Sequence, residues 1–116
     1  MLHLSPSCSY YLYAGSADMR KGFDSLSGMV SSLMQLNALD GSVFIFMNKK
    51  HNQVKLLLWE GDGFALYHKR LEKGTYELPC ATKEASIAIS AQQLQFILQG
   101  VSLKKIHFRV RYVKTA

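Results

Sequence analysis

Basic side chains gather in three short stretches of this chain, at residues 18–22, 49–55 and 69–73. Lysine and arginine neutralise phosphates, and the whole chain has a formal net charge of +6 and a pI near 9.4. A small basic domain often binds nucleic acid. The alternative is that the charge only keeps the protein soluble. The candidate phosphate contacts are Arg20, Lys21, Lys49, Lys50, Lys55, Lys69 and Arg70.

Two aromatic residues, Trp59 and Tyr67, lie between these basic stretches in the sequence. Stacking of a base on an aromatic ring is worth roughly 1–3 kcal/mol, so both are candidate nucleic-acid contacts. The alternative is a solvated sheet face whose aromatic side chains pack under another element. For Trp59 burial is favoured, because large aromatic residues are mostly buried.

The motif Asp18-Met19-Arg20-Lys21-Gly22 precedes a predicted helix, where free backbone N–H groups attract anions. Arg20 and Lys21 beside such a helix start would make a phosphate site. Alternatively, Asp18 caps the helix and pairs with a nearby base, and Gly22 is a packing requirement. The structural alternative is favoured on the residues alone because the motif is short.

Residues for catalysis or metal binding are present without a pattern that places them together. Glu60 and Asp62 flank a glycine, which is ordinary turn chemistry, and the four Asp and four Glu show no converging arrangement for two metals. Cys8 and Cys80 form no Cys-x-x-Cys pair, and the four histidines are scattered. The sequence therefore predicts no enzyme, no cofactor and no metal site.

The elements that must position these residues centre on a hairpin at 55–76, with Asp62-Gly63 as its turn signal. A three-residue loop, Gly61-Asp62-Gly63, segregates the apolar side chains better than a two-residue loop. This register is therefore predicted, with Gly63 in the left-handed conformation. It places Trp59 and Tyr67 between lysines on one face of the sheet and an apolar core on the other.

The rest of the chain predicts an α+β fold, in which a mostly antiparallel sheet packs with two helices. Consecutive hairpins suggest a meander of about four strands, the last at 75–78, whose apolar face the first helix covers. Ser16 and Asp18 are N-cap candidates for that helix, which runs from Phe23 to about 37–39; Ser90 is predicted to cap the second. Strands are expected at 10–14, 43–47, 53–60 and 86–89.

Length and composition fit one domain over 1–116, with a basic C-terminal strand or tail at about 104–116. Within it, residues 106–113 alternate apolar with basic or polar side chains. No run approaches the length of a membrane span, and the start lacks the pattern of a signal peptide. A cytoplasmic protein is expected.

Three motifs together resemble a known family. Residues 18–24, 55–64 and 69–74 resemble, in the same order, the small TnpB-type accessory protein of the bacterial insertion-sequence sixty-six group, which shares only a name with RNA-guided TnpB nucleases. The likeness spans about 10–101. It implies a gene beside a separate transposase, a role in transposition and no known catalysis. The family often has arginines in the loop where this chain has Asn48-Lys49-Lys50-His51, which keeps the charge but loses the bidentate forks that favour base-specific readout.

These observations predict a non-catalytic accessory factor that binds DNA, near the ends of the element or alongside the transposase. The rival is an adaptor that docks on the transposase and touches no DNA, in which case the face with Trp59 is an interface hot spot. The oligomeric state stays open, a homo-oligomer included.

Overall fold

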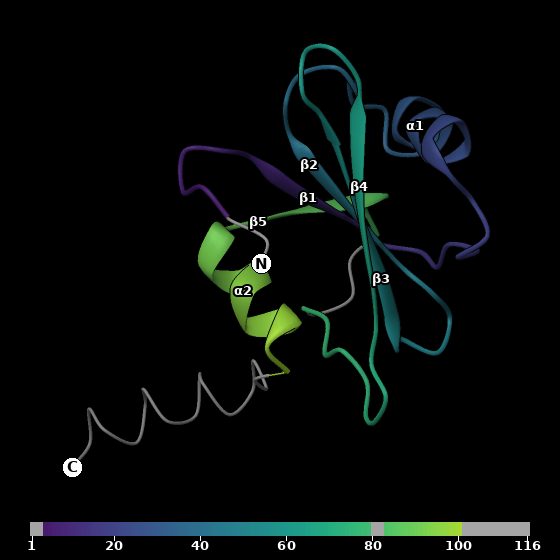
Figure 1. Ribbon diagram of the computed structural model, residues 1–116, viewed down its shortest axis with the longest axis vertical. Coiled ribbons are helices and arrows are strands. Elements are labelled where there is room, and N and C mark those ends of the chain that lie inside the picture. The colour runs from purple at the N-terminus through teal and green to yellow at the C-terminus, as the bar shows by residue number, and fades with distance from the viewer. Residues whose placement is uncertain (1–3, 80–82, 101–116) are drawn as a thin grey trace.

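The computed structural model describes residues 4–79 and 83–100. Five strands form one open sheet in the order β4-β3-β2-β1-β5, and two helices pack on it (Figure 1). β1 runs parallel to β2, and the other neighbours are antiparallel. The predicted α+β class with a mostly antiparallel sheet is therefore confirmed. The elements are β1 (Tyr10–Tyr13), α1 (Phe23–Ser32), β2 (Val43–Met47), β3 (Gln53–Trp59), β4 (Phe64–Arg70), β5 (Ser86–Ile89) and α2 (Ala91–Leu98).

The meander has three strands, β2, β3 and β4, and not four. Residues 75–78 form no strand; instead the Tyr76 side chain is buried and its N–H donates to the carbonyl of His51 (2.6 Å). β1 joins the sheet beside β2 through α1, because a parallel pair needs a crossover connection. The predicted strand at 106–113 lies outside the described residues.

The register of the β3–β4 hairpin differs from the prediction. Trp59 lies opposite Phe64, and the Glu60 N–H donates to the Gly63 carbonyl (2.8 Å), which leaves a two-residue loop. Gly61 takes the positive φ of +94°, and Gly63 does not. Since side chains alternate along a strand, Trp59 and Tyr67 lie on opposite faces of the sheet.

The reason for this difference is that both faces of the sheet are covered, by one helix each (Figure 1). Leu26 and Val30 of α1 pack with Phe44, Phe46 and Leu57. On the other face, the buried side chains of α2 pack with those of the strands, namely Leu94, Ile97, Leu12, Ile45 and Leu56. With two apolar faces, segregation into a dry and a wet face no longer selects the register.

The helix ends follow local chemistry in one case and not in the other. α2 starts with a capping box in which Ser90 and Gln93 bond reciprocally, as Ser90 predicts. α1 starts after Gly22 without a side-chain cap, so neither Ser16 nor Asp18 caps it, and it ends at Ser32 rather than near 37–39. Among the described residues, the helices are too short and too polar to cross a membrane.

Candidate nucleic-acid interface

Three segments that are distant in sequence meet at one end of the sheet. The Ala17 N–H donates to the Met47 carbonyl (2.8 Å), the Leu71 N–H to Asn52 (2.8 Å) and the Tyr76 N–H to His51 (2.6 Å). These bonds join the loop 17–22, the β2–β3 turn 48–52 and the segment 69–76. We call this region the basic end; its charged candidates are Arg20, Lys21, Lys49, Lys50, Lys69 and Arg70.

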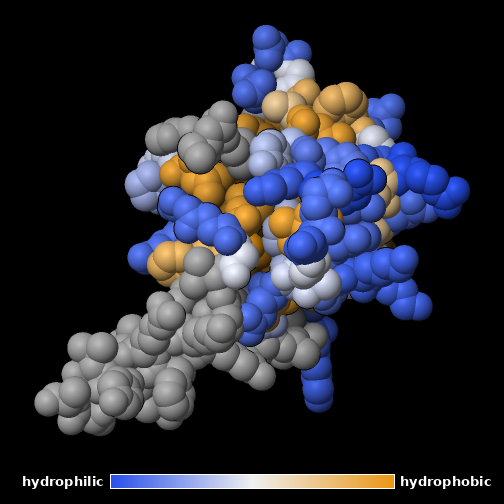
Figure 2. Space-filling model, turned by 60° about the horizontal axis from the view of Figure 1, so that its bottom comes forward, coloured by the Kyte–Doolittle hydropathy of each residue, from blue (hydrophilic) through white to orange (hydrophobic). Residues whose placement is uncertain are grey.

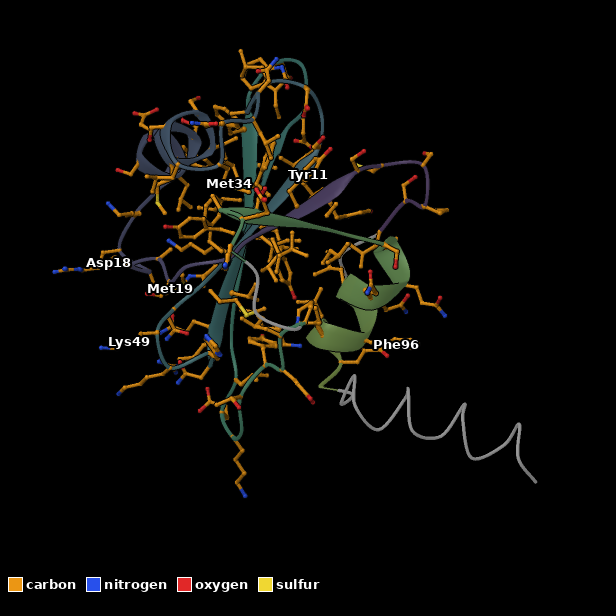
Figure 3. The ribbon with its side chains drawn as sticks, turned by 180° about the vertical axis from the view of Figure 1, so that it is seen from behind. Tyr11, Asp18, Met19, Met34, Lys49 and Phe96 are labelled. Carbon is orange, nitrogen blue, oxygen red and sulfur yellow. The ribbon has the colours of Figure 1, made fainter. Side chains whose placement is uncertain are left out.

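The figures agree with this grouping. Asp18, Met19 and Lys49 project on the same side of the molecule (Figure 3). Figure 2 turns the lower part of the molecule forward and shows hydrophilic side chains over much of it. The structure thus brings together most of the basic residues that the sequence singled out.

The β2–β3 turn is held by the side chain of Asn48. Its Oδ1 accepts from the N–H groups of Asn52 and Gln53 (both 3.0 Å), and its Nδ2 donates to Asn52 Oδ1 (2.6 Å). His51 has a positive φ of +58°. Lys49 and Lys50 are exposed on this turn, so two cations face solvent from a hydrogen-bonded support.

Arg20 is engaged locally by Asp18. Arg20 Nη2 lies 2.6 Å from Asp18 Oδ2, and Nε donates to the same carboxylate (3.1 Å). The Arg20 side chain and backbone N–H hold the pKa of the Asp18 carboxyl well below its usual range. Asp18 therefore pairs with a nearby base, as the structural alternative expected, although it does not cap the helix.

Lys55 is buried, with 7% of its surface exposed. Its Nζ donates to the backbone carbonyl of Lys21 (2.7 Å). A buried ammonium group needs such a partner, and this bond fixes the loop 17–22 to β3. Lys55 thus supports the basic end from below and does not offer its charge to a ligand at the surface.

Lys69 and Arg70 are exposed at the end of β4. Arg70 Nη2 contacts Glu72 Oε1 at 3.3 Å, and the two side chains are 65% and 83% exposed. Exposed ion pairs contribute little, so Arg70 can exchange Glu72 for another anion at low cost. Of the two arginines at this end, Arg70 is the freer one.

The aromatic candidates do not belong to the basic end. Trp59 is at the far end of β3, half-buried, with its ring edge-on to Phe64 (5.0 Å between centroids). Tyr67 lies opposite Leu56 and packs on the core under α2. The structure therefore separates both rings from Lys49 and Lys50.

Two polar residues that the sequence analysis did not select do belong there. His68 is the cross-strand neighbour of Lys55, and its Nε2 lies 2.9 Å from Gln53 Oε1. Burial, followed by the charges of Lys55 and Arg70, lowers the pKa of His68. The two-residue loop would have predicted this site, because its register pairs Lys55 with His68 and Gln53 with Arg70.

In the described part of the chain, no three His, Cys, Asp or Glu side chains form a group that could hold a metal ion. The Glu60 and Asp62 pair sits on the β3–β4 turn at the opposite end of β3 from the basic end.

Comparison with known proteins places the chain in a family. The family model described as "IS66 Orf2 like protein" matches residues 8–108. The chain belongs to the IS66 Orf2-like family. It is 36% identical to the uncharacterized protein y4hO of Sinorhizobium fredii over 87% of both chains.

A second relative from Sinorhizobium fredii, the uncharacterized protein y4jC, is 25% identical over 77% of this chain and 75% of its own. No solved structure matches the chain. The family suggests an accessory, non-catalytic role in transposition. The resemblance drawn from the three motifs is thereby confirmed.

Proposed function

We propose that this IS66 Orf2-like protein is a non-catalytic accessory factor that binds the DNA of its insertion sequence through the basic end. The observation that supports the proposal is the hydrogen-bonded convergence of 17–22, 48–52 and 69–76, which brings cations from three segments to the same end of the sheet. Two acidic side chains of this end, Asp18 and Glu72, pair with its arginines. Asp40, Glu60 and Asp62 stand at the opposite end of β2 and β3. A DNA backbone would meet the cationic end first.

Each basic residue has a distinct part in this proposal. Lys49, Lys50, Lys69 and Arg70 are exposed and would contact phosphates, as would Lys21 from the neighbouring loop. Arg20 would contact a phosphate only in exchange for Asp18. Lys55 holds the loop in place, and Trp59 and Tyr67 are outside the contact surface.

Such contacts give affinity without reading sequence, because lysines on a turn meet the DNA backbone as point charges. Preference for the ends of the element would then come from the transposase beside it, or from DNA shape. The protein would act in the cytoplasm, where the bacterial DNA lies.

The second candidate function is docking on the transposase without DNA contact. Its support is a set of large apolar side chains exposed on α1 and the following loop, Phe23, Leu33 and Leu39. Exposed apolar residues of this size are typical of binding surfaces when they are contiguous.

The experiment that separates the two functions replaces Lys49 and Lys50 by alanine. The double variant should unfold within about 0.5 kcal/mol of the parent, as expected for surface changes. If both lysines neutralise phosphates, the slope of log affinity against log salt should fall by about 1.8, at about 0.9 per contact. The measurement is binding to labelled duplexes of element-end and random sequence across a salt series.

Substitution of two charges at the opposite end, Glu60→Gln with Asp62→Asn, is the matched control. The control should keep the parent's slope. Parental affinity and slope in the lysine variant would favour the adaptor function, as would no binding of the parent at low salt.

A further inference from the structure

A shallow hollow of about 300 Å³ opens at the basic end, lined by Gln53, His68, Arg70 and Glu72. The lining is polar. Gln53 pairs across the strands with Arg70, so three of the four residues come from the adjacent ends of β3 and β4. Their positions are therefore set by the sheet and not by a loop.

Positive charge surrounds the imidazole of His68 on the sheet. Lys55 is its cross-strand neighbour on β3, and Arg70 is two residues away on the same face of β4. The acidic group near it is Glu72, which follows β4 and contacts Arg70 at 3.3 Å. An anion in the hollow would contact Arg70 and would need to displace only Glu72, while the buried Lys55 would act on it only through its charge.

The hydrogen bond to Gln53 restricts what His68 can do in its neutral form. With Nε2–H donating to Gln53 Oε1 (2.9 Å), Nδ1 is left as an acceptor. A phosphodiester at neutral pH offers only acceptor oxygens, so Nδ1 can bind one only after it takes up a proton. The added negative charge offsets Lys55 and Arg70 and makes that proton uptake favourable.

We propose that this hollow binds one phosphate of the DNA backbone between Arg70 and His68, and that His68 takes up one proton from solvent as it binds. The inference rests on the proposed DNA binding and names a subsite for it. Arg70 supplies the planar fork that suits a phosphate, and the amide of Gln53 orients the imidazole. Glu72 leaves the guanidinium when the phosphate arrives.

Proton uptake on binding makes affinity depend on pH. His68 has its pKa lowered in the free protein by burial, Lys55 and Arg70, and the bound phosphate raises it. Affinity for duplex DNA should therefore increase as pH falls from the pKa of the complex to that of the free protein, by up to about tenfold per pH unit. Outside that window the proton contributes no pH dependence.

The test uses the full chain and a random-sequence duplex of sixteen base pairs at constant salt, from pH 5 to 8. The NMR signals of the His68 ring, followed across this pH range, give its pKa with and without the duplex. Titration of the protein with the same duplex gives the affinity at each pH. His68→Gln should remove most of the pH dependence, and Arg70→Gln should lower the salt slope by about 0.9. His51→Asn is the matched control, because it removes the other described histidine of the basic end and tolerates a positive φ.

The outcomes distinguish the subsite from the function on which it rests. The subsite is supported if the pKa of His68 is higher in the complex and if affinity becomes independent of pH in His68→Gln but not in His51→Asn. If the duplex binds but the pKa of His68 and the profile of His68→Gln are unchanged, the hollow is not a phosphate site and DNA binding stands. If polyglutamate raises that pKa and the duplex does not, the hollow serves an acidic protein partner. Failure of the parent to bind duplex at low salt overturns the proposed function and the subsite together.

Discussion

The two turns that flank β3 differ in charge and in construction. The β2–β3 turn carries Lys49 and Lys50, is held by three hydrogen bonds of the Asn48 side chain, and is bonded through its backbone to the segment 71–76. The β3–β4 turn carries Glu60 and Asp62 and is closed by the bond from the Glu60 N–H to the Gly63 carbonyl, with Gly61 at positive φ.

The β2–β3 turn is thus a fixed support for its lysines, whereas the β3–β4 turn only reverses the direction of the chain. Seven residues of β3 place the turns roughly 20 Å apart, at about 3.3 Å per residue. That distance exceeds the Debye length of about 8 Å at physiological salt, so each turn acts on ligands independently of the other. The turn that is tied to other segments is the one to which we assign DNA contacts.

The largest effect is expected from Asn48→Ala. The change removes three hydrogen bonds and leaves the N–H groups of Asn52 and Gln53 without that partner in a half-buried turn. At roughly 0.5–1.5 kcal/mol per bond, the free energy of unfolding should fall by about 2–3 kcal/mol. DNA binding should weaken as well, since the turn that presents Lys49 and Lys50 loses its fixed shape.

Asn37→Ala is the matched control, because Asn37 makes one similar bond, to the Leu39 N–H (3.0 Å), in an exposed loop. It should cost about a third as much and leave DNA binding alone. Urea unfolding and duplex binding measure both effects. Equal stability loss in the two variants would show that the β2–β3 turn is no more firmly built than an ordinary loop.

A smaller effect is expected at the other turn, from Gly61→Val. Gly61 has a φ of +94°, which a β-branched residue adopts only under strain, so the variant should lose more than about 1 kcal/mol of stability. Gly63→Val is the control, since Gly63 does not have positive φ and no neighbour lies within 4 Å of an added Cβ. Thermal unfolding compares them, and DNA affinity should stay at the parent's level in both. A greater loss at Gly63 would support the three-residue loop instead.

Local sequence patterns correctly predicted those elements whose bounds depend little on the rest of the fold. The apolar run of β2 gives its bounds, and Ser90 gives the start of α2, because both signals are contained within a few residues. The register of the β3–β4 hairpin could not be obtained in this way. It depends on α1 and α2 covering both faces, which makes Lys55 acceptable between the buried Val54 and Leu56 once its Nζ reaches the Lys21 carbonyl.

The candidate site shows the same division. The exposed cations of the basic end were predicted from their residue types and their place near turns. The convergence of these cations at one end of the sheet could not be predicted. It depends on backbone hydrogen bonds such as that from the Ala17 N–H to the Met47 carbonyl, which join residues thirty positions apart. The roles of Lys55 and His68 follow from the strand register, so an error of one residue exchanged a buried support for a surface contact.

The smallest effect is expected from the double substitution Glu60→Gln with Asp62→Asn. The two carboxylates stand more than two Debye lengths from the basic end, so duplex affinity should change by less than about twofold and the salt slope should equal the parent's. Stability should stay within about 0.5 kcal/mol, because the side chains are exposed.

The same pair tests catalysis, because Glu60 and Asp62 are two carboxylates that flank a glycine and could be imagined as metal ligands. Supercoiled and linear DNA incubated with the parent and Mg²⁺ or Mn²⁺ should remain intact. Nicking by the parent that disappears in the double variant would make the β3–β4 turn a catalytic site. The turn that acts on DNA would then be the β3–β4 turn and not the β2–β3 turn.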